Sequence, residues 1–163
     1  MSNVVVTGSS GDLGQWVVGA LVRAGWQVRC LDHARPAEDL PPGVTAIETD
    51  LTDAGETLEA VLAADPEAVV HLAAVGPQYY APSRVYENNT LAAYHVLTAA
   101  GEAGADVVWT SSESVYGWVF AEGQVLPDAL PVSVDHACRP EDQYGVSKVA
   151  AEATAEAVAR RYD

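Results

Sequence analysis

A tyrosine and a lysine four residues apart are the side chains of this 163-residue sequence best suited to acid–base chemistry. They are Tyr144 and Lys148 in DQYGVSKVAAE (142–152), and Lys148 is the only lysine in the chain. Residues i and i+4 share one helix face, so both side chains can point into one site. A free phenol has a pKa of about 10, and a nearby ammonium stabilises the phenolate. The pair therefore predicts proton exchange near neutral pH; the alternative is an ordinary i,i+4 pair on a solvated helix.

The glycine-rich stretch TGSSGDLG is a second candidate site. It lies between a short β-branched run and a segment of helical periodicity, and it holds Gly8, Gly11 and Gly14. Glycines allow a sharp turn and a close approach of a pyrophosphate, and the following helix N-terminus favours anions. This context predicts a dinucleotide-binding turn; a glycine-rich turn without a ligand is the alternative.

Two aspartates follow predicted strands and could read the adenosine half of a dinucleotide. Asp32 stands 18 residues after Gly14, where a carboxylate accepts hydrogen bonds from ribose hydroxyls and repels a 2′-phosphate. It predicts NAD rather than NADP, although Arg35, three residues on, could hold a 2′-phosphate. Asp50 is expected to meet the adenine edge, or else to belong to the N-cap region of the next helix.

The period of the apolar residues switches repeatedly along the chain and predicts alternating strands and helices. Strands are expected at 3–7, 26–32, 43–50, 67–75 and 105–112. Helices are expected at 12–25, 53–65, 84–103 and about 142–161. In the first helix the apolar residues at helical spacing are Leu13, Trp16, Val17, Ala20, Leu21 and Ala24. Nearly continuous apolar strands predict one domain with a doubly wound, Rossmann-like parallel sheet that is covered on both faces.

The charge balance excludes several classes of partner. Eight basic residues stand against 23 acidic ones, for a net charge of −15, which argues against nucleic-acid binding. No apolar run is long enough to cross a membrane, and the N-terminus does not resemble a secretory signal. Cys30 and Cys138 form neither a disulfide framework nor a metal-ligand spacing, so a cytoplasmic protein without a metal is expected. The acidity and the scarcity of lysine predict adaptation to high salt.

Some residues remain open between function and packing. His71 lies inside an apolar strand, which favours a core histidine over a catalytic base. Four aromatic residues could either stack on a sugar or nucleotide base or pack within the protein, and the sequence favours neither role. They are Tyr79, Tyr80, Tyr116 and Trp118. The connection at 117–141 is long for a compact domain, and a role in facing the substrate is expected for it.

Five motifs occur in the order seen in extended short-chain dehydrogenases/reductases. They are TGSSGDLG, DL at 50–51, HLAA at 71–74, SSESVYG at 111–117 and YGVSK at 144–148. The chain most resembles the NAD-dependent sugar epimerase/dehydratase branch, and the resemblance covers its whole length. The glycine spacing TGxxGxxG is that of the extended enzymes.

The resemblance implies roles for further residues. Asp12 and Leu13 would present backbone N–H groups to the pyrophosphate, and Asp50 with Leu51 would flank the adenine. Further cofactor contacts would come from Leu72, Ala73, Ala74, Asn89, Tyr144 and Lys148, with Asn89 preferred over Asn88. Ser112 would be the catalytic serine beside the Tyr144–Lys148 pair. Ser112 would hydrogen-bond the reacting oxygen of the substrate while hydride passes to or from nicotinamide.

Family members usually run to 250–350 residues, so the resemblance also implies that the usual C-terminal substrate-binding region is absent from these 163 residues. The leading expectation is an NAD-dependent epimerase or dehydratase acting on a sugar or nucleotide sugar. A sugar or uronate dehydrogenase is the alternative within the enzymes, and a non-catalytic NAD-binding module or truncated fragment is the alternative outside them. A homodimer through helices 84–103 and 142–161 is expected.

Overall fold

The computed structural model of the chain describes residues 2–34 and 40–162. Its parallel sheet has five strands in the order β3-β2-β1-β4-β5. The strands are β1 (Asn3–Thr7), β2 (Gln27–Asp32), β3 (Val44–Glu48), β4 (Ala68–His71) and β5 (Asp106–Trp109). The helices are α1 (Asp12–Arg23), α2 (Ala54–Ala64), α3 (Pro82–Ala103), α4 (Gln143–Tyr162) and the short 3₁₀ helix η1 (Glu113–Tyr116). The expected doubly wound α/β fold is confirmed.

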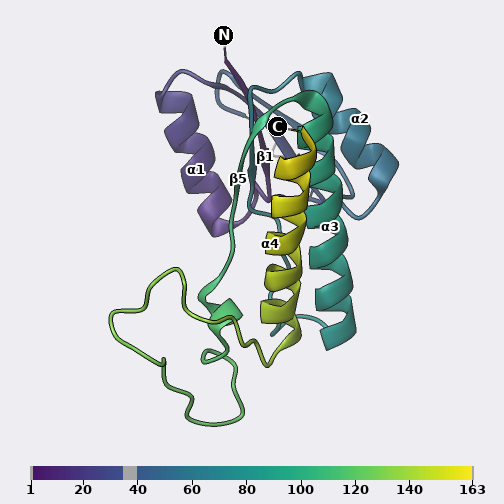
Figure 1. Cartoon of the computed structure of the whole chain (residues 1–163). Coiled ribbons are helices and arrows are strands. Elements are labelled where there is room, and N and C mark those ends of the chain that lie inside the picture. Colours follow the sequence, from purple (N-terminus) through teal and green to yellow (C-terminus); the bar gives the residue numbers. More distant parts are fainter. Residues whose placement is uncertain (1, 35–39, 163) are drawn as a thin grey trace.

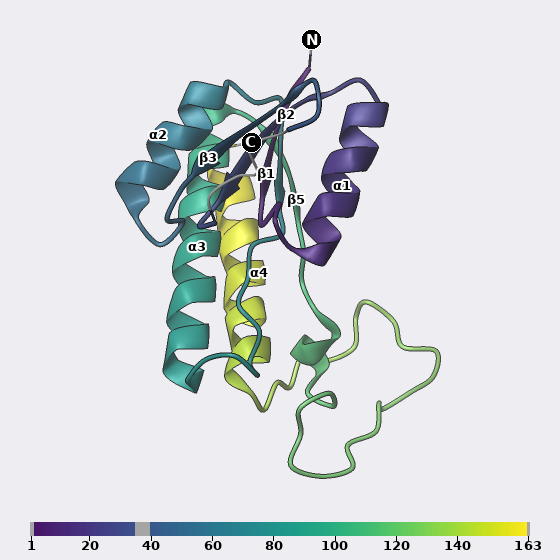
Figure 2. The same cartoon turned by 180° about the vertical axis from the view of Figure 1, so that it is seen from behind.

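Helices cover both faces of the sheet because successive strand residues point to opposite sides. From β1, Val4 and Val6 face the cluster formed with α1, whereas Val5 faces the cluster formed with α2 and α3. Figures 1 and 2 show α1 on one side of the sheet and α2, α3 and α4 on the other. The order of the strands brings the ends of β1 and β4 together, where parallel sheets bind ligands.

The apolar face predicted for α1 is wrong in part. Val18, Leu21 and Val22 pack on the sheet, while Leu13 and Trp16 are 54% and 77% exposed. The rotation of the helix follows from its first turn, because Gly14 is buried directly against the backbone of the glycine loop. The loop therefore decides which side of α1 meets the sheet.

Helices α3 and α4 lie side by side and share a small core made of Ala93, Leu97 and Ala151. Both are close to their predicted ranges. The predicted N-cap of α2 is confirmed, since the Asp53 carboxylate accepts a hydrogen bond of 2.9 Å from the Glu56 N–H.

Strand β5 forms the edge of the sheet and is poorly covered, contrary to the expectation that every strand is buried on both faces. Val107 is 37% exposed and Val108 is 64% exposed. After η1 the chain runs through a long loop that extends away from the sheet before α4 begins (Figures 1 and 2).

Candidate active site

The glycine loop follows β1 directly and passes close to the end of β4. Gly8 has φ +69°, and a Cβ added there would lie 2.6 Å from the backbone N of Ala73. A side chain at Gly14 would collide with the carbonyl oxygen of Gly8. The Gly11 N–H donates to that same oxygen over 3.2 Å and closes the turn. The close packing therefore explains Gly8 and Gly14, while Gly11 leaves the outer side of the turn open to a ligand.

Helix α1 begins with N–H groups that have no partner within the helix. The first bond from this helix back to its N-cap runs from the Gln15 N–H to the Gly11 carbonyl, over 3.0 Å. The N–H groups of Asp12 and Leu13 precede it, as in any helix N-terminus. Their predicted role toward a pyrophosphate requires only the backbone, and the exposed side chain of Leu13 agrees with this.

Asp32 ends β2 with its carboxylate against the glycine loop. Its Oδ2 accepts hydrogen bonds from the Ser10 N–H at 2.9 Å and from the Ser10 hydroxyl at 2.7 Å. Its Oδ1 accepts a longer bond from Ala34 N–H at 3.4 Å and lies 3.0 Å from His33 Nδ1. Burial alone would raise the pKa of this carboxyl, but the hydrogen bonds and His33 outweigh it and lower the pKa. Asp32 is thus an anion at neutral pH.

A groove of about 880 Å³ runs along these elements at the carboxyl ends of the strands. It is lined by Gly8, Ser10, Gly11, Asp32, His33, Glu48, Thr49, Asp50, Leu51, Thr52, Glu56, Leu72, Ala73, Ala74, Val75, Tyr80, Arg84, Asn88 and Ala92. The lining includes eight of the predicted cofactor-binding residues: Gly8, Gly11, Asp32, Asp50, Leu51, Leu72, Ala73 and Ala74. Arg35, the open alternative at the adenosine end, lies outside the described residues.

Asp50 lies both in the turn before α2 and in the lining of the groove. Its Oδ1 accepts hydrogen bonds from the Thr52 hydroxyl at 2.6 Å and the Thr52 N–H at 2.9 Å, which lower the pKa of the carboxyl. The Asp50 N–H donates to Glu56 Oε2 over 3.0 Å. The aspartate therefore organises the turn before α2 and also lines the groove.

Asn89 does not line the groove, whereas its neighbour Asn88 does. The Asn89 side chain is buried, and its amide forms two bonds with the Val75 backbone, of 2.8 Å and 3.0 Å. A longer contact of 3.4 Å joins its Nδ2 to the Ser147 hydroxyl. Asn89 thus holds the segment after β4 and connects it to α4. These contacts favour a structural role for Asn89 over a direct contact with the cofactor.

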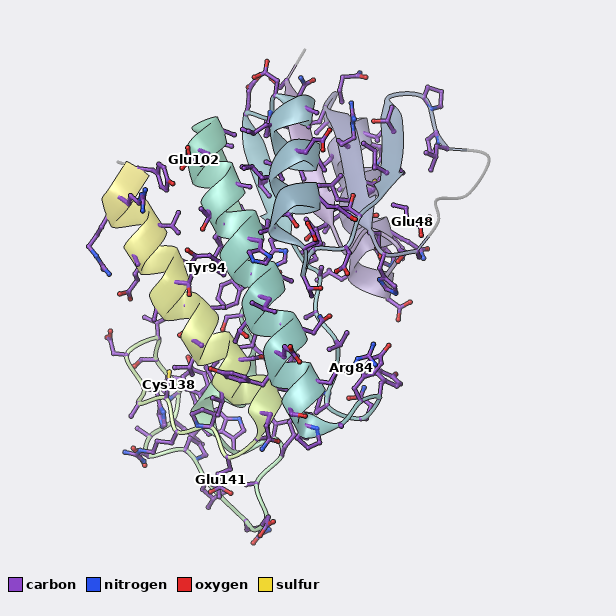
Figure 3. The ribbon with its side chains drawn as sticks, turned by 90° about the vertical axis from the view of Figure 1, so that its right-hand side faces the viewer. Glu48, Arg84, Tyr94, Glu102, Cys138 and Glu141 are labelled. Carbon is purple, nitrogen blue, oxygen red and sulfur yellow. The ribbon has the colours of Figure 1, made fainter. Side chains whose placement is uncertain are left out.

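Several groove residues were missed from the sequence. Among the described lining residues, Arg84 is the one arginine or lysine, and its guanidinium lies 5.1 Å from the centre of the Tyr80 ring. Figure 3 shows Arg84 near the start of α3 and Glu48 at the end of β3, at separate parts of this region. Ser10 was missed too, although a hydroxyl inside a glycine-rich turn could have suggested it. No sequence pattern separates Arg84 from the other exposed arginines.

The predicted catalytic residues come together at the ends of β5 and α4, outside the lining of the groove. Lys148 is only 4% exposed, and its Nζ donates to the Thr110 carbonyl over 2.7 Å. The Nζ atom lies 5.0 Å from the centre of the Trp109 ring and 5.6 Å from that of Tyr144. Burial lowers the pKa of Lys148 to about 8.

The Tyr144 phenol is partly buried beside Ser112. Burial raises its pKa, the hydrogen-bonding interaction with Ser112 opposes this in part, and the charge of Asp142 adds to it. The expected lowering of this pKa by Lys148 is therefore wrong for this structure, because the lysine itself is desolvated and its ammonium points to a backbone carbonyl. Ser112 also caps η1, since its Oγ accepts from the Ser114 N–H over 3.2 Å.

His71 is a core histidine, as favoured from the sequence. It is 1% exposed, and its Nδ1 lies 2.6 Å from the Thr7 hydroxyl. Burial, and secondarily the charge of Lys148, lower its pKa to about 3, so it is neutral at any ordinary pH. The His71 carbonyl accepts a hydrogen bond from the Thr110 N–H over 3.2 Å, and Thr110 in turn holds Lys148 through its own carbonyl.

A carboxylate on α4 fixes the end of β5 to the helix. The Ser111 hydroxyl donates to Glu152 Oε1 over 2.6 Å, one turn beyond Lys148. This tether joins the segment that carries Ser112 to the helix that carries Tyr144. Glu152 was not singled out from the sequence.

Three rings pack on one another where the long loop leaves η1: Tyr116 ends η1, and Trp118 and His136 belong to the loop. Tyr116 stacks on Trp118 with centroids 4.9 Å apart, and His136 meets both rings edge-on at 5.3 Å. An ion pair of 2.9 Å between Arg139 and Asp128 closes the same region. The Tyr116 and Trp118 rings therefore pack against each other and against His136. Tyr79 is 73% exposed, and Tyr80 lines the groove.

The groove fits a dinucleotide. It has a turn that brings backbone to the surface without side chains, a helix N-terminus for an anion and an ionised aspartate for ribose hydroxyls.

Among residues 2–34 and 40–162, no three His, Cys, Asp or Glu side chains gather to hold a metal ion. In that same part of the chain no helix is long and apolar enough to cross a membrane.

The parallel sheet and its groove define a dinucleotide-binding α/β domain of the short-chain dehydrogenase/reductase type. The chain belongs to the NAD-dependent epimerase/dehydratase family, whose model matches residues 4–163. NAD is accordingly the cofactor for which the groove is built.

Two relatives and one solved structure illustrate the range of the family. The chain is 33% identical over 156 residues to a UDP-glucose 4-epimerase from Azospirillum brasilense, covering 91% of this chain and 42% of that protein. It is 33% identical over 168 residues to an L-arabinose 1-dehydrogenase (NAD(P)(+)) from Haloferax volcanii, covering 99% of this chain and 63% of that protein. The structure of MoeE5 in complex with UDP-glucuronic acid and NAD superposes with a TM-score of 0.78 at 33% identity, covering 97% of this chain and 50% of that one. The chain thus spans less than two thirds of each of these proteins.

Proposed function

We propose that this chain is the NAD-binding part of an epimerase or dehydratase that acts on a sugar or nucleotide sugar. The observation that carries the proposal is the burial of Lys148 beside Tyr144, because burying an ammonium costs free energy and such perturbed groups cluster at functional sites. The similarity to a UDP-glucose 4-epimerase and to a structure with UDP-glucuronic acid supports the substrate class.

Each residue of the site has a defined task in this proposal. Tyr144 takes the proton of the sugar hydroxyl, and Ser112 hydrogen-bonds the same oxygen. Lys148 supplies a cation one helical turn from the phenol. Bound NAD supplies the acceptor for the hydride that leaves the carbon. An ammonium suits the site better than a guanidinium because it is compact enough to reach both the tyrosine and a ribose hydroxyl.

A sugar or uronate dehydrogenase is the second candidate. It is favoured by the L-arabinose 1-dehydrogenase, which matches 99% of this chain. The two candidates differ in the fate of the hydride, since an epimerase or dehydratase returns it within each turnover and a dehydrogenase releases NADH.

The experiment is an NAD titration by calorimetry followed by turnover assays with a panel of nucleotide sugars and free aldoses. An altered sugar without net NADH supports the epimerase or dehydratase, and stoichiometric NADH supports the dehydrogenase. Tight NAD binding without turnover of any sugar in the panel would instead identify a non-catalytic module. Such a module would also fit the proposal that residues 1–163 form one NAD-binding domain.

A homodimer through α3 and α4 is part of the proposal. An apolar groove of about 340 Å³ lies on the outer side of the two helices, and exposed small residues there, such as Ala153 and Ala157, permit close helix packing. Sedimentation analysis should give a dimer that Ala157→Arg converts to a monomer. The matched control is Ala20→Arg, which alters an exposed alanine on α1, on the other side of the sheet. A monomeric parent protein would refute the dimer.

We also place the protein in the cytoplasm. Cys30 and Cys138 are both free thiols, as expected in a reducing compartment. Fractionation of cells that produce the protein, with thiol labelling of Cys138, tests this; secretion or an oxidised Cys138 would contradict it.

A further inference from the structure

The end of β2 carries a titratable pair that the proposed reaction does not use. We propose that His33 makes the choice between NAD and NADP depend on pH, by competing with a ribose hydroxyl for Asp32 and by offering a cation to a 2′-phosphate. The inference rests on the proposed function in one respect, namely that Asp32 receives the adenosine ribose.

The two oxygens of Asp32 are not equally available. Oδ2 already accepts two short hydrogen bonds, both from Ser10. Within residues 2–34 and 40–162, Oδ1 accepts a single backbone bond, the long one from Ala34, which leaves room for one more strong donor. His33 Nδ1 lies 3.0 Å from that same atom. A ribose hydroxyl and a protonated His33 therefore compete for Oδ1.

The side chains of His33 and Asp32 differ in how freely they can move. The His33 side chain is 85% exposed, while that of Asp32 is 9% exposed and fixed by Ser10. A neutral imidazole can therefore turn into solvent at little cost and release Oδ1. A protonated imidazole is held by a charge-assisted hydrogen bond, which is about twice as strong as a neutral one.

The other acidic residues described in the lining of this end of the groove are three carboxylates. Asp50 is close enough to His33 for their charges to interact, and Glu48 and Glu56 line the same groove. Glu48 comes from the neighbouring strand β3 (Figure 3), and the glycine loop contributes the uncharged Ser10. With neutral His33, these carboxylates repel a 2′-phosphate. Among the described residues that line this end, protonated His33 adds the one positive charge; His95, whose charge also acts on Asp50, does not line the groove.

Imidazole changes its charge between about pH 5 and 8, so the two states are separable by experiment. At the upper end NAD should bind far better than NADP. At the lower end NAD should lose the Oδ1 acceptor and NADP should gain a cation. The ratio of the two dissociation constants, NADP over NAD, should fall by about two- to fivefold because of His33, the range expected for an exposed charge interaction.

The test is calorimetric titration of the protein with NAD and NADP at about pH 5.5 and about pH 8, in the parent and in His33→Gln. The 2′-phosphate itself gains a proton near pH 6, which alone weakens the repulsion. The His33→Gln variant keeps the effect of phosphate protonation and loses the effect of the imidazole. The difference in pH dependence of the affinity ratio between the parent and this variant therefore measures the contribution of His33. Raising the salt concentration should shrink this difference, because the pair is exposed.

Equal pH dependence of the ratio in the parent and His33→Gln would overturn the proposal. So would a pH dependence that disappears with Arg35→Gln and survives in His33→Gln. Asp32→Asn separates this inference from the proposed function. If NAD binds the parent and Asp32→Asn equally well, the assumed ribose site is wrong; if only the His33 comparison fails, the function stands and the inference falls.

Discussion

The ammonium of Lys148 lies 5.6 Å from the centre of the Tyr144 ring, one helical turn away on α4. Its strong hydrogen bond, however, goes to the backbone of Thr110 at the end of β5. The pair is therefore assembled across two elements that are distant in sequence, and a change at either end should alter the chemistry.

Lys148→Arg should remove most of the activity. The larger, planar guanidinium cannot occupy a site that is 4% exposed and still reach both the phenol and a ribose. We expect kcat to fall by about 10²- to 10⁴-fold, the usual contribution of acid–base groups. Circular dichroism should report an intact fold, and near-normal turnover would contradict the assignment.

Tyr144→Phe should lower kcat by a similar factor and leave the affinity for NAD within about threefold, because only the proton-exchanging group is lost. Tyr79→Phe is the matched control, since that tyrosine is 73% exposed and does not line the groove. Steady-state kinetics and NAD titration check both variants. An equal loss in the two would indicate a nonspecific effect.

The buried lysine should make stability depend on pH. The pKa of Lys148 is about 8 in the folded chain against 10.5 ordinarily, so between these values the unfolded chain binds more protons and stability rises with pH. The penalty present in full below pH 8 is on the order of 3 kcal/mol. Lys148→Met removes it, so the stability of this variant relative to the parent should decline from pH 8 toward pH 10 in urea unfolding. A constant difference would show that the lysine remains solvated.

Gly8→Ala should abolish NAD binding at ordinary concentrations. Its φ is +69°, and the new Cβ would lie 2.6 Å from the Ala73 backbone, which lines the groove. Gly104→Ala is a close control, because Gly104 has φ +67° and no atom within 4 Å of the added Cβ. The control should lose only about 1 kcal/mol in thermal or urea unfolding. Similar NAD affinities of the two variants would refute the packing argument.

High salt should stabilise the protein. With a net charge of −15, the surface carboxylates repel one another at low ionic strength, and ions screen that repulsion. The melting temperature should rise steadily as potassium chloride is increased to molar concentrations. Full stability after dialysis into low salt would remove the case for salt adaptation.

The sequence predicted the layout of the fold better than its contacts. The order of strands and helices, the glycine turn and the N-cap Asp53 were predictable because each depends on local spacing. The residues after His71 were expected to continue β4, but they leave the sheet and line the groove. Apolar residues suit both surroundings, so composition alone does not mark where the strand ends.

Other site features depend on tertiary packing. Motif spacing selected Asn89, and only the fold shows that its amide is used by Val75 while Asn88 faces the groove. The predicted lowering of the Tyr144 pKa was wrong because the sequence argument considered the charge of Lys148 and left out the burial of the phenol, which raises the pKa. Trp16 lies on the exposed side of α1 because the glycine loop fixes the rotation of the helix, a constraint that periodicity does not contain.

The ring cluster of Tyr116, Trp118 and His136 has a consequence for evolution and for engineering. Because the long loop carries a small packed centre of its own, its outer residues contribute little to the stability of the sheet. Insertions or exchanges between residues 119 and 135 should thus be tolerated as long as the three rings are kept. This segment can diversify while the cofactor groove stays constant.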